Sequence, residues 1–169
     1  MKKRVGVIMG GPSAERAVAL ASGRRVAEAL SDRGYPVIAI DWTGTDHNLW
    51  SDLRRDRVEV AFVALHGTLG EDGCIQGLLE CAGIPYTGSG VLASALAMDK
   101  VASRRVFDEA SIETPRWTVY EGPADVQRIG LPLVVKPSRE GSSVGISIVH
   151  HESQLESALQ LASRLHGVV

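Results

Sequence analysis

The chain has 169 residues, of which 44% are hydrophobic and 22% are charged, and its formal net charge is −2. This composition is typical of a globular protein, and the nearly balanced charge gives no bias towards nucleic acid. The length allows one ordinary domain, or one small domain and part of another. No apolar run approaches the length of a membrane span, and the first one breaks at Gly10, too early for a secretory signal.

The N-terminal sequence predicts a parallel strand followed by a long helix. Residues 5–9 are apolar throughout, and residues 13–30 carry apolar side chains at helical spacing. Ser13 is expected to cap the helix, with Glu15 in its first turn, where the helix dipole favours a carboxylate. Alternatively, Glu15 lies at the carboxyl edge of the sheet, where open α/β sheets bind ligands, and holds a cationic amine. From these residues alone, capping is the simpler explanation.

A second strand is predicted at residues 37–40, ending at Asp41. A dinucleotide-binding Rossmann unit also carries an acid at this point. However, residues 10–15 read GGPSAE rather than G-x-G-x-x-G, and the carboxylate of Glu15 would oppose a pyrophosphate. We therefore reject a dinucleotide site and expect Asp41 to be solvated. The polar residues 43–56 are expected to form an irregular connection.

A glycine-rich loop follows the third predicted strand, residues 58–65. His66, three glycines and two acids, Glu71 and Asp72, fall within eight residues before a helix near residues 74–81. So many glycines indicate close approach of the backbone to another group. A structural histidine with two acids at a helix start explains the same residues equally well.

The first domain is predicted to span residues 1–97. A short strand at residues 84–86 and a small-residue helix at residues 91–98 lead to its end. Cys74 and Cys81 lie two helical turns apart without C-x-x-C spacing. We expect both to be buried free thiols in a reducing, cytoplasmic compartment.

Residues 98–169 are predicted to form a second subdomain. Its expected elements are a helix at residues 101–110, a strand at 114–120, a short helix at 124–129 and an amphipathic helix at 152–165. Lys100 precedes the first of these helices. Exposure of its side chain to solvent is the simplest explanation of this lysine.

A polar loop lies between two short apolar strands of this subdomain, residues 133–135 and 144–149. Lys136 precedes the loop glycine and no helix follows, which excludes a Walker-type phosphate loop. The hydroxyl groups of Ser142 and Ser143 and the backbone N–H groups of the loop suit a polyphosphate, with Lys136 as a point charge. An ordinary polar hairpin tip is the alternative.

Three stretches at matching intervals carry a family resemblance. They are GGPSAER at residues 10–16, the stretch from residue 66 to 76 that continues through GIPYTGSG to residue 100, and residues 136–145. Together they closely resemble D-alanine–D-alanine ligases of the ATP-grasp superfamily. The resemblance implies an α/β fold, in which an open, parallel, doubly wound N-terminal domain precedes a partial α+β ATP-grasp subdomain.

The activity that the resemblance implies is the ATP-dependent joining of two D-alanine molecules in the cytoplasm, for peptidoglycan precursor synthesis. ATP phosphorylates the carboxylate of one D-alanine, and the amine of the second attacks the acyl phosphate. Glu15 matches the glutamate that binds the ammonium group of the first D-alanine. Ser142 matches the serine that orients this glutamate and the substrate, and His66 matches the histidine near the reacting carboxyl group. Glu71 is a further candidate.

Lys100 and Lys136 match the two lysines that contact the ATP phosphates, and Ser143 is a further candidate for the same site. The resemblance also implies Mg²⁺ as a cofactor, with metal ligands expected beyond Val169. It implies a homodimer formed through the N-terminal domain, and neither nucleic acid nor membrane as a partner.

The sequence departs from the family pattern in two ways. Ala17 and Ala19 stand where the family often has a glutamate and a serine, which removes polar groups beside the first D-alanine site. The family also continues well past Val169.

Two hypotheses follow: a ligase whose remaining part lies outside this sequence, or a binding or assembly module without catalysis. The joint presence of Glu15, His66, Ser142 and the two lysines favours the ligase.

Overall fold

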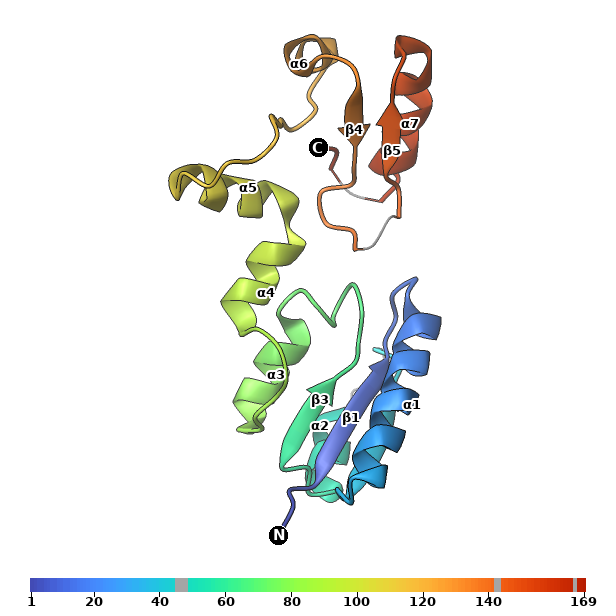
Figure 1. Cartoon of the computed structure of the whole chain (residues 1–169), viewed down its shortest axis with the longest axis vertical. Coiled ribbons are helices and arrows are strands. Elements are labelled where there is room, and N and C mark those ends of the chain that lie inside the picture. The colour runs from blue at the N-terminus through green and yellow to red at the C-terminus, as the bar shows by residue number, and fades with distance from the viewer. Residues whose placement is uncertain (45–48, 142–143, 166) are drawn as a thin grey trace. The chain divides into compact units, whose positions relative to one another are not determined.

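The computed structural model describes residues 1–44, 49–141, 144–165 and 167–169 (Figure 1). The chain divides into two compact units, Met1–Ala95 and Leu96–Val169. Each unit has a sheet and a hydrophobic core of its own. No helix in the described ranges is both long and apolar enough to cross a lipid bilayer.

The first unit is built on a parallel sheet with the strand order β2-β1-β3. The strands are β1 (Val5–Gly10), β2 (Val37–Trp42) and β3 (Val60–Val63). Beyond β3, Tyr86 forms a single parallel bridge to Ala61, so the strand expected at residues 84–86 is reduced to this bridge. The central strand β1 is buried along its whole length, as its unbroken apolar sequence predicts.

Helices pack on both faces of this sheet: α1 (Arg16–Asp32), α2 (Leu49–Arg55) and α3 (Cys74–Ala82). One cluster joins β1 to α1 through Val5, Val7, Met9, Leu20 and Val26. A second cluster joins β1 to α2 and α3 through Ile8, Leu49, Leu53, Ile75 and Leu79. Alternate residues of β1 therefore face opposite helical layers, and the doubly wound fold is confirmed. Full burial of one such Leu or Ile contributes about 1.5–3 kcal/mol.

Two expectations for the first unit are wrong. Residues 43–56 are not all irregular, because α2 forms there and buries Leu49 and Leu53, which lie four residues apart on one helical face. Cys74 and Cys81 are free thiols, but both are exposed. The apolar face of α3 is occupied by its more hydrophobic side chains.

The second unit contains an antiparallel hairpin and three helices that the sequence predicts. The elements are α5 (Lys100–Glu109), α6 (Pro123–Ile129), β4 (Leu133–Val135), β5 (Ser147–Val149), the short 3₁₀ helix η1 (Glu152–Gln154) and α7 (Leu155–Ser163). The helix α4 (Val91–Met98) contains the division between the units. In the hairpin, Val134 pairs with Ile148. The core of the second unit contains Val135, Val149, Ala158, Ala162 and Val168.

Residues 167–169 lie beside the segment that follows β4. Lys136 and Val169 exchange two backbone hydrogen bonds of 2.8 and 2.9 Å, and the N–H of Tyr120 donates to the carbonyl of Val168 over 3.0 Å. The expected strand at residues 114–120 is absent, because only this last residue meets a partner backbone. The segment is extended without forming a ladder.

Candidate functional site

The first unit brings Glu15 and His66 to one edge of its sheet. Glu15 lies in the turn between β1 and α1, and His66 follows β3, the strand next to β1. The two turns touch, because a Cβ atom added to Gly67 would lie only 3.2 Å from Oε2 of Glu15. The sequence predicts this meeting, since the carboxyl ends of neighbouring parallel strands share an edge.

Ser13 does not cap the helix as expected. The helix begins at Arg16, and Glu15 occupies the N-cap position without a side-chain capping bond. Instead, Oγ of Ser13 accepts a hydrogen bond from the N–H of Glu15 over 3.2 Å and donates one to the carbonyl of His66 over 2.7 Å. No described residue forms a hydrogen bond or ion pair with the Glu15 carboxylate, which leaves a half-buried anionic group at the edge.

The loop from His66 to Gly73 is held by its own acids. Glu71 accepts the N–H of Gly67 over 2.7 Å through Oε2, and its Oε1 lies 3.8 Å from Nδ1 of His66. Asp72 accepts the N–H groups of Leu69 and, at the start of α3, Cys74. Thus Glu71 faces the imidazole, while Asp72 has the helix-start role that the sequence predicts.

Gln76 is a buried polar residue for which the local sequence pattern gives no role. Its side chain is on the face of α3 that also buries Ile75 and Leu79, and it is 5% exposed. Nε2 donates to the carbonyl of Gly70 over 2.9 Å. Gln76 therefore ties the glycine-rich loop to α3. A polar side chain on an otherwise apolar helical face is the one sequence signal that could have marked it.

Asp41 is not simply solvated at the end of β2. An ion pair of 2.9 Å joins it to Arg16, whose guanidinium also donates to the carbonyl of Trp42 over 3.2 Å. Arg16 therefore links the turn that carries Glu15 to the neighbouring strand. About half of the Asp41 side chain is exposed, so the pair contributes at most about 1 kcal/mol.

In the second unit, the first turn of α5 is tied to the segment after Lys136. The backbone N–H of Lys100 donates to the carbonyl of Ser138 over 2.9 Å, and Nζ donates to that of Glu140 over 2.7 Å. Asp99 caps the helix through the N–H groups of Val101 and Ala102, each at 3.0 Å. It also pairs with Nε of Arg139 at 2.9 Å.

The charge on Lys100 is disfavoured by its surroundings. Partial burial lowers the pKa of its ammonium group below 10.5, and the positive charge of Lys136 lowers it further, against the opposite effect of Glu140 and Asp99. Two lysines that repel one another in a half-buried place favour an anion between them.

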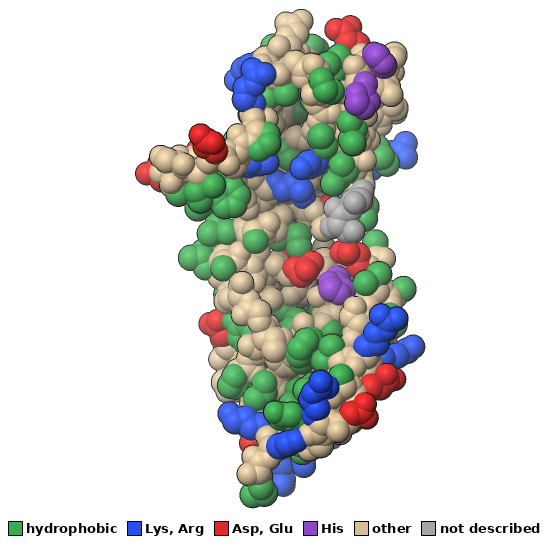
Figure 2. Space-filling view, viewed as in Figure 1, with side chains coloured by type: hydrophobic (Ala, Val, Ile, Leu, Met, Phe, Trp, Pro, Cys, Tyr) green, Lys and Arg blue, Asp and Glu red, His purple; other side chains and the backbone are tan. Residues whose placement is uncertain are grey.

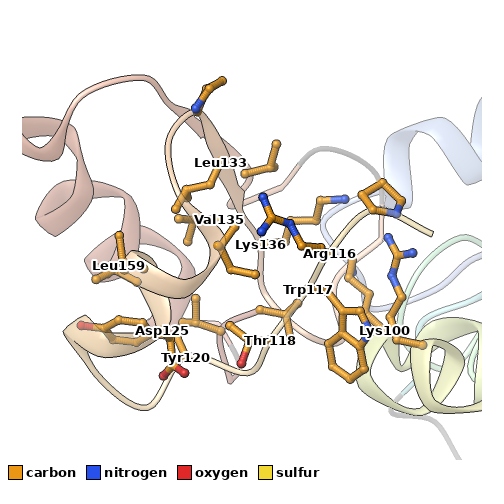
Figure 3. Close-up of a pocket in the computed structure, with 18 of the residues that line it drawn as sticks. Lys100, Arg116, Trp117, Thr118, Tyr120, Asp125, Leu133, Val135, Lys136 and Leu159 are labelled. Atoms are coloured by element: carbon orange, nitrogen blue, oxygen red, sulfur yellow. The ribbon is translucent and has the colours of Figure 1, made fainter. Parts of the chain in front are cut away.

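Both lysines line a cavity of about 650 Å³ within the second unit. Leu133, Val135 and Leu159 lie towards one end, and Lys100, Arg116 and Trp117 towards the other (Figure 3). The volume is in the range of small-molecule sites, whose lining is typically apolar with a few polar groups. The arrangement suits a ligand with an apolar part and an anionic part. The resemblance had pointed to the lysines, whereas Arg116 and Trp117 were not expected.

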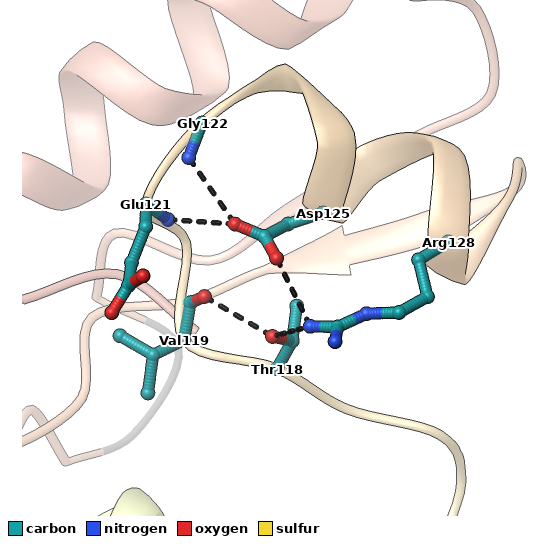
Figure 4. A network of polar contacts seen from close by, with 6 residues as sticks. All are labelled: Thr118, Val119, Glu121, Gly122, Asp125 and Arg128. Atoms are coloured by element: carbon teal, nitrogen blue, oxygen red, sulfur yellow. Dashed lines mark hydrogen bonds and ion pairs between the residues drawn. The ribbon is translucent and has the colours of Figure 1, made fainter.

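One wall of the cavity is fixed by a polar network at the start of α6 (Figure 4). Asp125 accepts the N–H groups of Glu121 and Gly122 over 2.9 and 3.2 Å, and its other oxygen accepts from Arg128 over 3.0 Å. Arg128 also donates to the hydroxyl of Thr118. The backbone bonds lower the pKa of the Asp125 carboxyl, so it stays ionised and acts here as a cap.

Ser142 and Ser143, expected at the D-alanine and ATP sites, lie outside the described residues. Among the residues that the structure does describe, no three His, Cys, Asp or Glu side chains are gathered as a metal site. On the face shown in Figure 2, basic and acidic side chains are interspersed, in keeping with the net charge of −2.

Two family models match this sequence. The model described as D-ala D-ala ligase N-terminus matches residues 44–89, and the one described as D-ala D-ala ligase C-terminus matches residues 106–169. The chain is 51% identical over 165 residues to a D-alanine–D-alanine ligase of Desulforudis audaxviator, covering 94% of this chain and 53% of the relative. It is 52% identical over 172 residues to one of Trichlorobacter lovleyi, covering 99% and 54%. The chain thus spans about half the length of these relatives.

Solved structures give the same similarity. A D-alanine–D-alanine ligase from Bacillus anthracis matches with a TM-score of 0.85 and 36% identity, covering 98% of this chain and 55% of that one. The same enzyme complexed with ATP matches with a TM-score of 0.80 and 35% identity, covering 98% and 56%.

Proposed function

The chain belongs to the D-alanine–D-alanine ligase family, and we propose that it carries the first D-alanine site and the phosphate-binding part of the ATP site of such a ligase. The observation that carries this proposal is the presence of Lys100 and Lys136 at one cavity, each able to contact a phosphate. Phosphoryl transfer depends mainly on positioning and on neutralising oxygen charge, which is what paired lysines supply.

At the sheet edge of the first unit, Glu15 binds the ammonium group of a D-alanine. Its carboxylate has no partner among the described residues, and an ammonium ion supplies the missing charge and donors. The ring of His66 faces Glu71, and we assign His66 to the carboxylate of the same D-alanine. We assign the orienting role in this site to Ser142.

At the cavity of the second unit, the lysines bind the phosphates of ATP. We assign Ser143 to the same phosphates. ATP transfers its γ-phosphoryl group to the carboxylate of the first D-alanine, which releases ADP. The amine of a second D-alanine then attacks the acyl carbon, phosphate leaves, and D-alanyl-D-alanine forms.

The remaining parts of the proposal follow the family. Mg²⁺ accompanies ATP and would neutralise phosphate charge when bound. The division into an N-terminal domain at residues 1–97 and an incomplete ATP-grasp subdomain at residues 98–169 is part of the proposal. So are a cytoplasmic location, a role in peptidoglycan synthesis and a homodimer formed by the N-terminal domain.

Separate titrations of this chain with D-alanine and ATP test the two sites. Glu15→Gln should abolish D-alanine binding and leave ATP affinity unchanged, because only the carboxylate faces an ammonium group. Lys136→Ala should do the reverse. Unaltered affinities in both variants would refute the assignment of both sites.

The second candidate is a module that binds D-alanine and ATP without catalysis. Phosphate release with ATP, Mg²⁺ and D-alanine, compared with release when D-alanine is omitted, tests this candidate. D-alanine-dependent release would exclude a module without catalysis. Binding without release would leave this chain as the substrate-binding portion of a ligase or as a binding module.

A further inference from the structure

We propose that Ser13 is a positioning residue that fixes the distance between Glu15 and the His66–Gly67 turn, and thereby sets the preference of the amino-acid site for a ligand with an ammonium group. This inference rests on the proposed function of that site. Ser13 itself is not assigned a contact with the ligand.

The evidence is a hydroxyl group that bonds to both turns at once. Oγ of Ser13 donates to the carbonyl of His66 over 2.7 Å and accepts from the N–H of Glu15 over 3.2 Å. A serine hydroxyl has one hydrogen to donate and lone pairs to accept, so one atom satisfies both neighbours. The first of these bonds spans 53 positions of sequence, which local capping of a helix does not require.

Close packing leaves little room for the two turns to shift. Gly67 has a positive φ of +69°, and a Cβ atom added there would lie 3.0 Å from Cβ of Ser13 and 3.2 Å from Oε2 of Glu15. Both bonds of Ser13 are partly buried, which strengthens them relative to bonds in water. The backbone on which Glu15 stands is therefore held against the backbone from which His66 projects.

The partners of the two ligand-facing groups show what Ser13 adds. Glu71 lies 3.8 Å from Nδ1 of His66 and so contacts the ring, whereas Ser13 fixes the backbone of the same residue. Glu15 has no side-chain partner among the described residues, so its placement depends on its backbone. An amino acid must meet a carboxylate at its ammonium end and an imidazole at its carboxylate end. A small misplacement of either protein group weakens binding of the amino acid.

The experiment measures D-alanine and D-lactate binding by amide chemical shifts of Glu15 and Gly67 in the 169-residue chain. D-lactate has the carboxylate and methyl group of D-alanine but a hydroxyl in place of the ammonium group. The variants are Ser13→Ala, which removes both bonds, and Ser13→Cys, which keeps the shape but bonds weakly. Ser51→Ala, an exposed serine on α2, is the matched control.

We expect Ser13→Ala to weaken D-alanine binding about tenfold, because loss of the two hydrogen bonds should cost about 1.4 kcal/mol of binding free energy, which is one decade in affinity. D-lactate binding should change much less, so the ratio of the two affinities falls. The affinity ratio of Ser13→Cys should lie between those of Ser13→Ala and wild type, and the ratio of Ser51→Ala should match that of wild type. ATP affinity should be unchanged in all three.

Equal weakening of both ligands would show that Ser13 only stabilises the fold, and would overturn the inference while leaving the proposed function intact. An unchanged D-alanine affinity in Ser13→Ala would overturn it as well. If Ser13→Ala does not fold, the affinity ratio of Ser13→Cys decides the question by the same criteria. Absence of D-alanine binding by the wild-type chain would instead refute the proposed function, and the inference with it.

Discussion

The ammonium group of Lys100 donates a hydrogen bond to the backbone carbonyl of Glu140, with 2.7 Å between nitrogen and oxygen. This bond joins the first turn of α5 to the segment that follows Lys136, the other lysine of the cavity. The position of one lysine thus depends on the backbone that carries the other. Burial lowers the pKa of Lys100, and the positive charge of Lys136 lowers it further. An anion bound at both lysines would relieve the repulsion between them.

Alanine substitution of the two lysines should weaken ATP binding in a coupled manner. We expect Lys100→Ala and Lys136→Ala each to lower the affinity by about 1.5–3 kcal/mol, the usual contribution of a bond to a charged group. Because both lysines contact one polyphosphate, the loss of binding free energy in the double variant should differ from the sum of the losses in the two single variants. Calorimetric titration with ATP measures all three.

The control for these variants is Arg105→Ala, which removes a positive charge from an exposed position on the same helix. It should leave ATP affinity within a few tenths of a kcal/mol of wild type. A loss as large as that of Lys100→Ala would mean that only net charge matters.

The lowered pKa of Lys100 predicts the pH dependence of ATP binding. Only the protonated lysine attracts phosphate, and its pKa in the free protein lies below 10.5 because of partial burial and the charge of Lys136. Affinity should therefore fall as pH rises through this lowered pKa, before an ordinary lysine would titrate. Arginine stays protonated throughout this range, so Lys100→Arg should remove this component. A pH profile identical in the two proteins would contradict the assignment.

The sequence predicts those parts of the fold that local pattern determines. Unbroken apolar runs predicted β1 and β4, and the strand-edge rule brought Glu15 and His66 together. The second hairpin strand, expected at residues 144–149, is shorter, because β5 covers only Ser147–Val149. The helix α2 was missed because only two of its side chains, Leu49 and Leu53, face the core. The strand expected at residues 114–120 failed because strand formation depends on a partner backbone, which local sequence does not specify.

The site was predictable in its residue types but not in its internal bonds. The hydrogen bond from Ser13 to the carbonyl of His66 joins positions that are 53 residues apart in sequence, and local propensity assigns this serine to a helix cap instead. The same applies to Gln76, whose partner is the backbone of Gly70. Lys100 and Lys136 were paired only through the family resemblance, since nothing in either local sequence indicates that they share a cavity.

Asp99 is expected to make the second unit sensitive to acid. Its carboxylate caps α5 and pairs with Arg139, and the backbone bond from Ala102 is the largest cause that lowers its pKa below 3.8. Because the folded-state pKa is the lower one, its stabilisation is complete above pH 3.8 and is lost as pH falls through the folded-state pKa.

Asp99→Ala should lower the free energy of unfolding by about 0.5–2 kcal/mol at neutral pH, the usual cost of losing a cap. Asp99→Asn keeps an oxygen that can accept the helix N–H groups, so it should be less destabilised and should lose the acid sensitivity. Urea unfolding at neutral and acidic pH measures both effects. Equal stability of Asp99→Ala and wild type would exclude the capping role.

Alanine substitution at two glycines of the first unit should have opposite effects on its stability. Gly67 has a φ of +69°, and a Cβ atom there would approach Ser13 and Glu15 to between 3.0 and 3.2 Å. Left-handed backbone costs a non-glycine residue about 1–3 kcal/mol, and the contact adds to this. Gly77 lies inside α3, and a Cβ atom there would meet nothing within 4 Å. Gly77→Ala should therefore stabilise the unit by about 0.5–1 kcal/mol.

The same pair of variants separates folding from binding, because only Gly67 lies against the carboxylate of Glu15. Gly67→Ala displaces that carboxylate or the Ser13 side chain, so D-alanine affinity should fall even where the variant is fully folded. Gly77→Ala should bind D-alanine as wild type does. The measurements are thermal unfolding and D-alanine titration at a temperature at which both variants are native. Normal D-alanine binding by folded Gly67→Ala would show that the amino-acid site tolerates movement of Glu15, contrary to the proposed geometry.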